Sequence, residues 1–456
     1  MKKISFTATY FFIYLSFIII TKIYASLQCI DYLNPLNLRD KILVPCPHVR
    51  SNKIEVRDNN NLEDESKNMF DLTFNCNLND EKMCKKAKST FESAGRILSS
   101  VLSLNTKIGL NATFRPLEGN LLGAAGPSRT IPFRDDDGKI RLYAQSLAKQ
   151  FQLEVHPEYS SVDILADFNS NIPFWFEGDP PIQPNQTGFE ELVLHELTHG
   201  LGFLSSWSND YLEESSSFLT PNIDGIVSNV GDNIESKSIL IFRGFIENAF
   251  DKYMILTSNR THTTELTSEL DKFRDGQDRK FTSINEFNEK FKSSPQFNIA
   301  KQMYKTCIKS NSIGFLSNTS NINNNAVILE TGINPFRGGA SLSHIDEKLF
   351  NSSDFLMTFE QLPGRTLEDS INASGSKGGK EKAIGPRTLA ILETLGLIFP
   401  QSSSTESCSS SHCTKANSSP DSNMDDLSSS SNNLSVFNMA SMVIFIFGVS
   451  LFNVVM

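Results

Sequence analysis

The stretch that most constrains this chain is Glu191–Gly202, which contains the pattern His-Glu-x-x-His at His195, Glu196 and His199. Residues four apart on a helix share one face, so both imidazoles can reach one metal ion. Glu196 lies one step around the helix, where it can contact a water on that metal. Two histidines and one further ligand leave an open position on Zn²⁺, as catalytic sites do. An amphipathic helix with two surface histidines shows the same pattern, so the flanking residues decide between the two interpretations.

The flanking residues favour a metal-binding helix that ends abruptly. Glu190 and Glu191 fall in its first turn, where acidic groups complement the helix dipole. Gly200 and Gly202 follow the second histidine and let the chain leave the helix sharply. A half-buried strand is predicted over 162–170, and a strand followed by this helix indicates a sheet packed on one helix, an α+β arrangement.

The third ligand is not where the motif alone would place it. In metzincin metalloproteases the pattern continues as H-E-x-x-H-x-x-G-x-x-H, and here Gly202 matches the glycine while Ser205 replaces the third histidine. Serine is a poor zinc ligand, so either the site is inactive or another part of the chain supplies the third ligand. The other side chains considered for this role are Asp210, Glu213, Glu214, Asp224, His262 and His344.

Three later segments carry a resemblance to a known family. They are 338–346, which contains a Gly-Gly lead and a Ser-His pair, 354–358, which contains Leu-Met, and 386–397, which ends in Leu-Gly-Leu. Together with 160–207 they resemble the leishmanolysin family of cell-surface metzincins, which supplies the third ligand after an inserted subdomain. The match covers about 160–207 and 335–399 and leaves the insertion unaligned.

The resemblance implies the site residues directly. His195, His199 and His344 would bind one Zn²⁺, Glu196 would be the catalytic carboxylate, and Met357 would lie beneath the metal in a turn. The cysteine framework of the family is largely missing from the C-terminal half, and no tyrosine closely follows the methionine.

The expected fold class is α+β: a zincin- or metzincin-like catalytic domain with a twisted sheet packed on the active-site helix. A helical insertion and a mainly helical C-terminal subdomain complete it. The predicted parts of the chain are a signal peptide over 1–26, an N-terminal arm or pro-segment over 27–70, catalytic subdomains over 71–207 and 334–400 with an insertion over 208–333 between them, a Ser-rich stalk over 401–435 and a hydrophobic tail over 436–456.

Individual elements can also be predicted from periodicity. Apolar residues recur at three and four over 81–104, which predicts a helix, and 107–115 alternates as a strand does. Gly and Pro at 123–127 indicate a loop. Within the insertion, apolar spacing predicts an amphipathic helix over 242–254 and further helical packing over 287–303.

Both ends of the chain carry targeting signals. A basic start and an apolar run ending at Ala25-Ser26 predict a cleaved secretory signal peptide. The apolar tail has no basic flank after it and follows a polar spacer, which indicates a glycolipid (GPI) attachment signal, with attachment between Ser419 and Ser431. A retained helix at either end is the alternative. The predicted location is the outer face of the plasma membrane or the cell wall.

Cysteines and sequons agree with that compartment. Seven cysteines suggest disulfides, with Cys29–Cys46, Cys76–Cys84 and Cys408–Cys413 as the plausible pairs and Cys307 left over. Asn-x-Ser/Thr sequons occur at Asn111, Asn185, Asn259, Asn318, Asn351 and Asn372. A net charge of −10 argues against nucleic acid as a partner.

These observations favour a zinc-dependent endopeptidase that acts on protein or peptide substrates, with Glu196 as general base. We expect an extended substrate to pair with an edge strand near 162–168. The alternative is a glycosylated surface adhesin or binding protein that kept the fold without turnover. A metal-dependent hydrolase of a non-peptide substrate is a weaker third possibility.

Overall fold

The structure is a computed structural model that describes residues 28–38, 40–49, 68–209, 217–230, 237–317 and 326–397. The predicted signal peptide, Ser-rich stalk and hydrophobic tail lie outside these ranges, as do Cys408, Cys413 and Asn318. Within the described ranges, no helix has both the length and the apolar character needed to cross a membrane.

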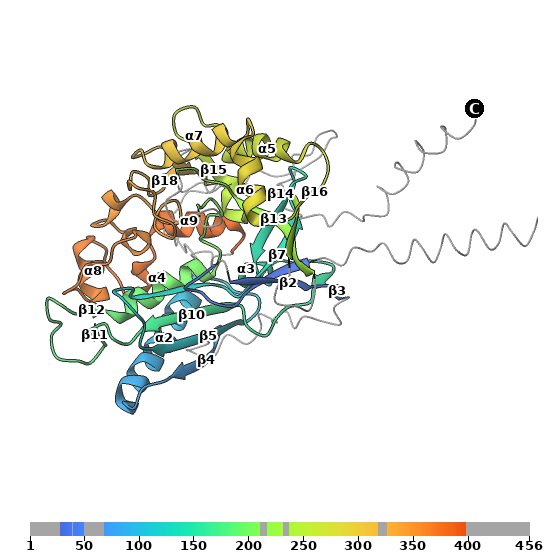
Figure 1. Ribbon diagram of the computed structural model, residues 1–456. Coiled ribbons are helices and arrows are strands. Elements are labelled where there is room, and N and C mark those ends of the chain that lie inside the picture. Colours follow the sequence, from blue (N-terminus) through green and yellow to red (C-terminus); the bar gives the residue numbers. More distant parts are fainter. Residues whose placement is uncertain are drawn as a thin grey trace, which may run out of the picture.

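The chain forms a mixed α and β structure whose largest layer is a four-stranded sheet (Figure 1). The strands run in the order β4, β5, β10, β6; the first three are parallel and β6 is antiparallel to β10. Their bounds are Phe70–Cys76 for β4, Ile108–Arg115 for β5, Ile164–Asn169 for β10 and Gly123–Pro127 for β6. The strands predicted over 107–115 and 162–170 are therefore confirmed, whereas the loop predicted over 123–127 is wrong, because those residues form an edge strand of the sheet.

Two helices cover one face of this sheet. Helix α2 (Glu81–Val101) confirms the helix predicted over 81–104 and packs against β4, and helix α4 (Phe189–Gly200) packs against β6 and β10. An aromatic cluster fills the layer between them: the ring of Phe189 lies 5.8 Å from Phe91 and 5.4 Å from Phe168. Because Phe189 is the first residue of α4, burial of its ring fixes the start of that helix on the sheet.

A second four-stranded sheet incorporates the described part of the predicted N-terminal arm. Its order is β2, β1, β7, β8, and the disulfide Cys29–Cys46 links β1 to the residue that follows β2. The second predicted pair, Cys76–Cys84, is also bonded, and Cys307 is free and buried. The bounds are Gln28–Tyr32 for β1, Lys41–Pro45 for β2, Arg129–Arg134 for β7 and Ile140–Ala144 for β8, followed by helix α3 (Gln145–Ala148).

The insertion is less helical than predicted. Residues 242–254 are not one helix: strand β14 (Lys237–Ile246) is followed by the 3₁₀ helix η1 (Ala249–Tyr253). Opposite β13 (Asn222–Val230), the register passes from Gly225↔Phe242 to Asp224↔Gly244, which leaves Arg243 as an extra residue. Such a bulge breaks the two-residue alternation of a strand and gives the buried residues a helix-like spacing.

The remaining insertion elements pack around this hairpin. The helical packing predicted over 287–303 is confirmed by α6 and α7. The insertion also contains β15 (Met254–Leu256), α5 (Thr263–Asp271), η2 (Lys272–Arg274), β16 (Arg279–Phe281), α6 (Ile284–Lys292), α7 (Phe297–Cys307), β17 (Ile313–Phe315) and β18 (Val327–Ile328).

The C-terminal segment returns to α4 and is built from short helices. In Figure 1 its orange ribbon lies on the side of α4 away from β10, and η4 contacts α4. Its helices are η3 (Glu347–Leu349), η4 (Phe355–Met357), α8 (Leu367–Ala373), η5 (Lys380–Ala383) and α9 (Pro386–Leu395). Short two-stranded pairings, β3 (His48–Val49) with β9 (His156–Pro157) and β11 (Phe174–Trp175) with β12 (Thr187–Gly188), complete the described structure.

Candidate metal centre and cleft

Helix α4 presents His195 and His199 on one face because they are four residues apart, and its C-terminal end lies close against the sheet. A Cβ added at Gly200 would lie 2.6 Å from Ile164 of β10, so only glycine allows this close approach. The chain then turns at Gly202, whose φ of 104° is the left-handed conformation that glycine adopts freely. This turn brings the carbonyl oxygen of Phe203 to 2.8 Å from Nδ1 of His199.

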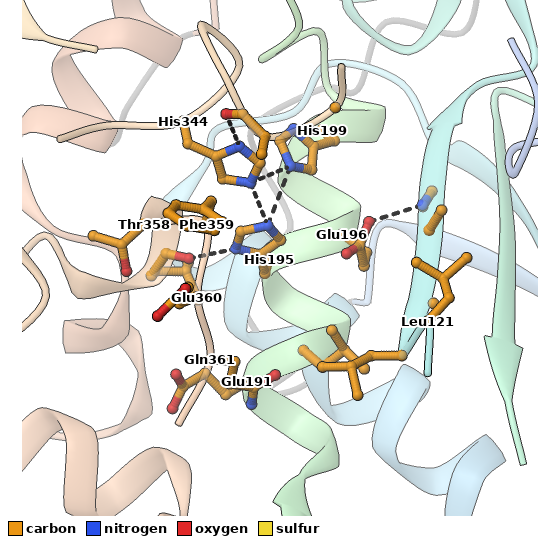
Figure 2. A pocket seen from close by; sticks show the side chains of 18 of the residues that line it. Leu121, Glu191, His195, Glu196, His199, His344, Thr358, Phe359, Glu360 and Gln361 are labelled. Carbon is orange, nitrogen blue, oxygen red and sulfur yellow. Dashed lines mark hydrogen bonds between the residues drawn. The ribbon is translucent and has the colours of Figure 1, made fainter. Parts of the chain in front are cut away.

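Three imidazoles from two distant parts of the chain meet at one point. The Nε2 atom of His199 lies 3.2 Å from that of His195 and 3.2 Å from that of His344, and the Nε2 atoms of His195 and His344 are 2.9 Å apart. Figure 2 shows the three rings converging, with His344 arriving from the segment that follows the insertion. The structure thus brings together the three side chains that the sequence and the family resemblance single out.

The other ring nitrogen of each imidazole contacts a backbone carbonyl oxygen. The Nδ1 atom lies 2.6 Å from Leu356 O in His195, and 2.9 Å from Ala340 O in His344. Because a carbonyl oxygen can only accept a hydrogen bond, each Nδ1 carries the proton and each Nε2 presents a lone pair.

Three converging lone pairs repel unless a cation lies among them. Nitrogen atoms that share one zinc ion in a tetrahedral site, each at about 2.0–2.1 Å from it, are separated by roughly 3.3 Å. The separations of 2.9–3.2 Å come close to that value. The donor set and its spacing therefore fit one zinc ion held by His195, His199 and His344.

Burial keeps these imidazoles in the neutral form that binds metals. It lowers the pKa of His195 to about 3 and that of His199 to about 4, and it lowers the pKa of His344 well below the usual value. Backbone acceptors at the three Nδ1 atoms oppose this effect without reversing it. The cluster is thus in a ligand-ready protonation state at neutral pH.

Glu196 lines the same cleft as the three histidines and points from α4 towards strand β6. Its Oε2 accepts a hydrogen bond of 2.8 Å from the backbone N–H of Ala125 in the edge strand β6, and the residue is 9% exposed (Figure 2). Burial raises the pKa of this carboxyl to about 8, although the hydrogen bond from Ala125 counteracts part of the rise. A divalent cation beside it would favour the ionised form.

The Leu-Met turn joins two of the three histidine segments through its backbone. Leu356 O accepts from His195, and Met357 O accepts a hydrogen bond of 2.9 Å from the N–H of Ile345, the residue after His344. The Met357 side chain is completely buried. The Leu-Met turn therefore connects α4 to the segment of the third histidine and sets the spacing between them.

One residue in a strained backbone conformation lies close to the third histidine. Leu342 has a φ of 68°, a left-handed conformation that is uncommon for a side chain with a Cβ, and its N–H donates to Glu330 O. Glu330 N–H in turn donates to His344 O at 2.8 Å. Strained residues of this kind cluster at functional sites, where the surrounding contacts hold them in place.

Ser205, which stands where many metzincins have a histidine, has a structural role here. Its Oγ donates to Asp251 Oδ1 at 2.7 Å and thereby joins the turn after α4 to the insertion. Among the rival ligands, Asp224 pairs with Arg243 and His262 Nδ1 lies 3.1 Å from Lys252 O. Neither belongs to the histidine cluster, and Asp210, Glu213 and Glu214 lie outside the described residues.

A cleft of about 810 Å³ opens over the cluster. The strand β6 and the loop before it form one wall, and the segment after the methionine turn forms the opposite wall. Two large apolar side chains, Leu121 at 48% exposure and Leu362 at 40%, belong one to each wall. A cleft of this size, with a histidine cluster at its base and an edge strand along it, can receive an extended chain.

Sequence reasoning missed three contributors to this cleft. Ala125 could not be predicted, because β6 is rich in glycine and alanine and has no apolar alternation. The prediction that substrate pairs with an edge strand near 162–168 is wrong, because β10 is paired on both sides, by β5 and β6. Glu191 could have been found, since it lies four residues before His195 and shares its helix face. Gln361 gave no signal, because only the fold brings it next to α4.

Comparisons with known proteins relate this chain to one family. The chain is 26% identical over 347 residues to a Schizosaccharomyces pombe protein whose name is "Uncharacterized protein PB7E8.01", with 70% of this chain and 60% of that protein covered. This chain therefore matches less than two thirds of that relative's length. No solved structure matches the chain. A family model described as SPBPB7E8-like matches residues 29–437, which include both histidine segments and the whole cleft. Because the match takes in most of its length, the chain belongs to the SPBPB7E8-like family.

Proposed function

We propose that this protein is a zinc-dependent endopeptidase of the cell surface. The observation that carries the proposal is the meeting of three unprotonated Nε2 atoms, 2.9–3.2 Å apart, beneath an open cleft that also contains the Glu196 carboxyl. Bound zinc would supply a Lewis acid that polarises a carbonyl group and activates a water molecule.

Glu196 is the group of the chain that moves the proton. Its carboxylate takes a proton from water as the water attacks the peptide carbonyl, and then returns that proton to the leaving amine. The hydrogen bond from Ala125 N–H holds one carboxylate oxygen, so the other is free to face the reacting water. The three histidines stay neutral because burial lowers their pKa values, while the Nδ1 hydrogen bonds to backbone carbonyls fix the ring orientation.

The substrate would bind as an added strand on β6. Among the described strands, β6 pairs only with β10, so its outer edge faces the cleft. Backbone hydrogen bonds to such an edge hold a peptide extended and bring one of its carbonyl groups over the cluster. Peptide or unfolded protein segments are therefore the proposed substrate class.

Secretion and lipid anchoring remain part of the proposal. The disulfides Cys29–Cys46 and Cys76–Cys84 are compatible with an oxidising compartment. The signal peptide and the GPI signal are inferred from the sequence alone, and release of the protein from intact cells by a GPI-specific phospholipase would test the anchor.

The decisive variant is Glu196→Gln, assayed in the full-length protein purified with zinc on a dye-labelled denatured protein. The amide oxygen can still accept from Ala125 N–H, so the fold is kept while the base is lost. We expect kcat to fall by about 10²–10⁴-fold, and a chelator to abolish wild-type activity. The exposed carboxyl of Glu118, replaced in Glu118→Gln, is the matched control. Equal activity in wild type and Glu196→Gln would refute the proposed function.

A further inference from the structure

A second carboxyl lies on the floor of the cleft, one helical turn before the first histidine. Glu191 precedes His195 by four residues, so both project from the same face of α4. Its side chain lines the cleft and is 7% exposed. Figure 2 shows Glu191 beside Gln361, towards the N-terminal end of α4 from the histidine cluster. The proposed reaction does not use this group.

The surroundings of Glu191 leave its carboxyl short of donors. Ser370 supplies a hydrogen bond, and Arg365 lies near enough to favour the charged form. The Arg365 guanidinium is itself directed elsewhere, over the ring of Phe350 at 5.4 Å and towards Asn351 Oδ1 at 3.4 Å. Burial outweighs both effects and raises the pKa of Glu191 to about 7. A carboxylate can accept about four hydrogen bonds, so capacity remains at this position.

Neighbouring groups add further acceptors. Gln361 donates its Nε2 hydrogen to Gly188 O at 2.9 Å, while its Oε1 atom is buried and has no partner among the described residues. Glu360, one residue earlier and exposed, lines the same wall of the cleft. Leu362 contributes apolar surface to that wall. This end of the cleft thus combines hydrogen-bond acceptors and negative charge with an apolar rim.

Lys and Arg side chains complement that combination best. Each has a long apolar stem and a cationic head, with three N–H donors in Lys and five in Arg, whereas apolar side chains offer no donor and acidic ones add a like charge. A buried acceptor without a donor costs free energy, so an apolar side chain would be disfavoured there.

We propose that the pocket formed by Glu191, Gln361 and Glu360 binds a Lys or Arg side chain of the substrate, which makes the enzyme selective for basic residues next to the cleaved bond. The proposal rests on the proposed peptidase function. It assigns Glu191 as the residue that determines specificity, through a charge-assisted hydrogen bond to the substrate.

The test begins with the full-length wild-type protein, loaded with zinc and incubated with a mixture of synthetic peptides that contains every residue type. Mass spectrometry of the products should show Lys or Arg enriched at one fixed position beside the cleaved bond. Peptides that differ only there, with Lys or norleucine, then give kcat/KM. We expect a Lys-to-norleucine ratio of at least about 30 in the wild type.

Variants of the pocket residues then test whether the pocket causes the Lys-to-norleucine ratio. Glu191→Gln should lower it at least tenfold, and Glu191→Lys should favour a Glu peptide instead. Gln361→Leu removes the second acceptor and should lower the same ratio, which covers the case in which a Glu191 variant does not fold. Glu368→Gln makes the same charge change on the exposed face of α8 and should leave the ratio unchanged.

The outcomes separate the two proposals. Cleavage without a basic preference, or a preference that persists in both Glu191→Gln and Gln361→Leu, would overturn the specificity assignment and leave the peptidase function standing. Absence of cleavage of every peptide by the zinc-loaded wild type would overturn both.

Discussion

At the scale of single residues, the cluster is set by contacts that the histidines make on the side away from their converging Nε2 atoms. Each Nδ1 proton is donated to a carbonyl of a different segment: the turn after α4, the lead to the third histidine and the methionine turn. These acceptors fix the tautomer and the ring orientation together, as outer contacts do in metal sites generally. The side chains that bind and the backbone that positions them therefore form one unit.

A carboxylate cluster beside the methionine turn gives a pH-dependent prediction. Glu347 N–H donates to Glu330 Oε2 at 3.0 Å, and the charges of Glu330 and Glu360 lie near its carboxyl. Burial first, and Glu360 second, raise the pKa of Glu347 from 4.5 to about 7. The folded state therefore holds this proton more tightly than the unfolded state does. The resulting stabilisation is complete below about pH 4.5 and is lost as the pH rises through about 7.

Replacement of the carboxyl by an amide removes that dependence. Relative to the wild type, Glu347→Gln should gain on the order of 1 kcal/mol in unfolding free energy between pH 5 and pH 8, a value reduced for solvent screening of a partly exposed group. Urea unfolding of both proteins at the two pH values measures this. Glu118→Gln, an exposed carboxyl outside the cluster, should show no such gain, and an equal gain in that control would contradict the prediction.

At the scale of elements, a buried arginine joins the β7–β8 hairpin to the insertion. Arg141 is 1% exposed and donates to Glu247 at 3.0 Å, to Asp135 at 2.7 Å and to Thr264 of α5 at 3.2 Å. Asp135 and Glu247 are themselves buried, and a third acidic partner, Asp137, accepts from Arg141 at 2.8 Å nearer the surface. Removal of the cation would leave uncompensated charges in a low-dielectric environment, which is strongly unfavourable.

Arg141→Met should therefore lower the unfolding free energy by about 3–5 kcal/mol. Arg134→Met, an exposed arginine on the same hairpin, should change it by less than about 0.5 kcal/mol. In the double variant Arg141→Met/Glu247→Gln the loss should be smaller than the sum of the two single losses, because the unpaired charge is removed as well. Denaturant unfolding of the four variants checks this, and a loss under 1 kcal/mol in Arg141→Met would contradict the account.

The elements that could be predicted from the sequence are those whose pattern arises from a single contact face. Helix α2 and strand β5 each bury one side, so their periodicity is regular. Strand β6 could not be predicted, because its Gly and Ala residues pack closely under α4 and carry no hydrophobic alternation. Strand β14 was predicted as a helix because its bulge shifts the buried positions.

At the scale of the whole molecule, the candidate site depends on contacts across more than a hundred residues. The motif gives His195, Glu196 and His199 by local spacing, since all three lie on one helix. His344 could be singled out only through the family resemblance, because nothing local shows that the chain returns to α4. The floor and walls of the cleft, including Glu191 and Gln361, follow from the fold and could not be predicted without it.

The insertion and the C-terminal segment therefore act together in building the site. The insertion fixes the turn after α4 through Ser205 and Asp251, and the C-terminal segment supplies both the third histidine and the methionine turn. The site is complete only because the chain returns to α4 after the insertion. We propose that His344 completes a metal centre begun by His195 and His199.

The most direct test is the amount of zinc bound per chain in the purified full-length protein, measured by elemental mass spectrometry after exhaustive buffer exchange. We predict one zinc ion per chain in the wild type and in His262→Ala, a histidine outside the cluster. In His344→Ala we predict less than about one tenth of that amount, because loss of one ligand of three weakens zinc binding by several kcal/mol. Full zinc occupancy in His344→Ala, or none in the wild type, would contradict the account.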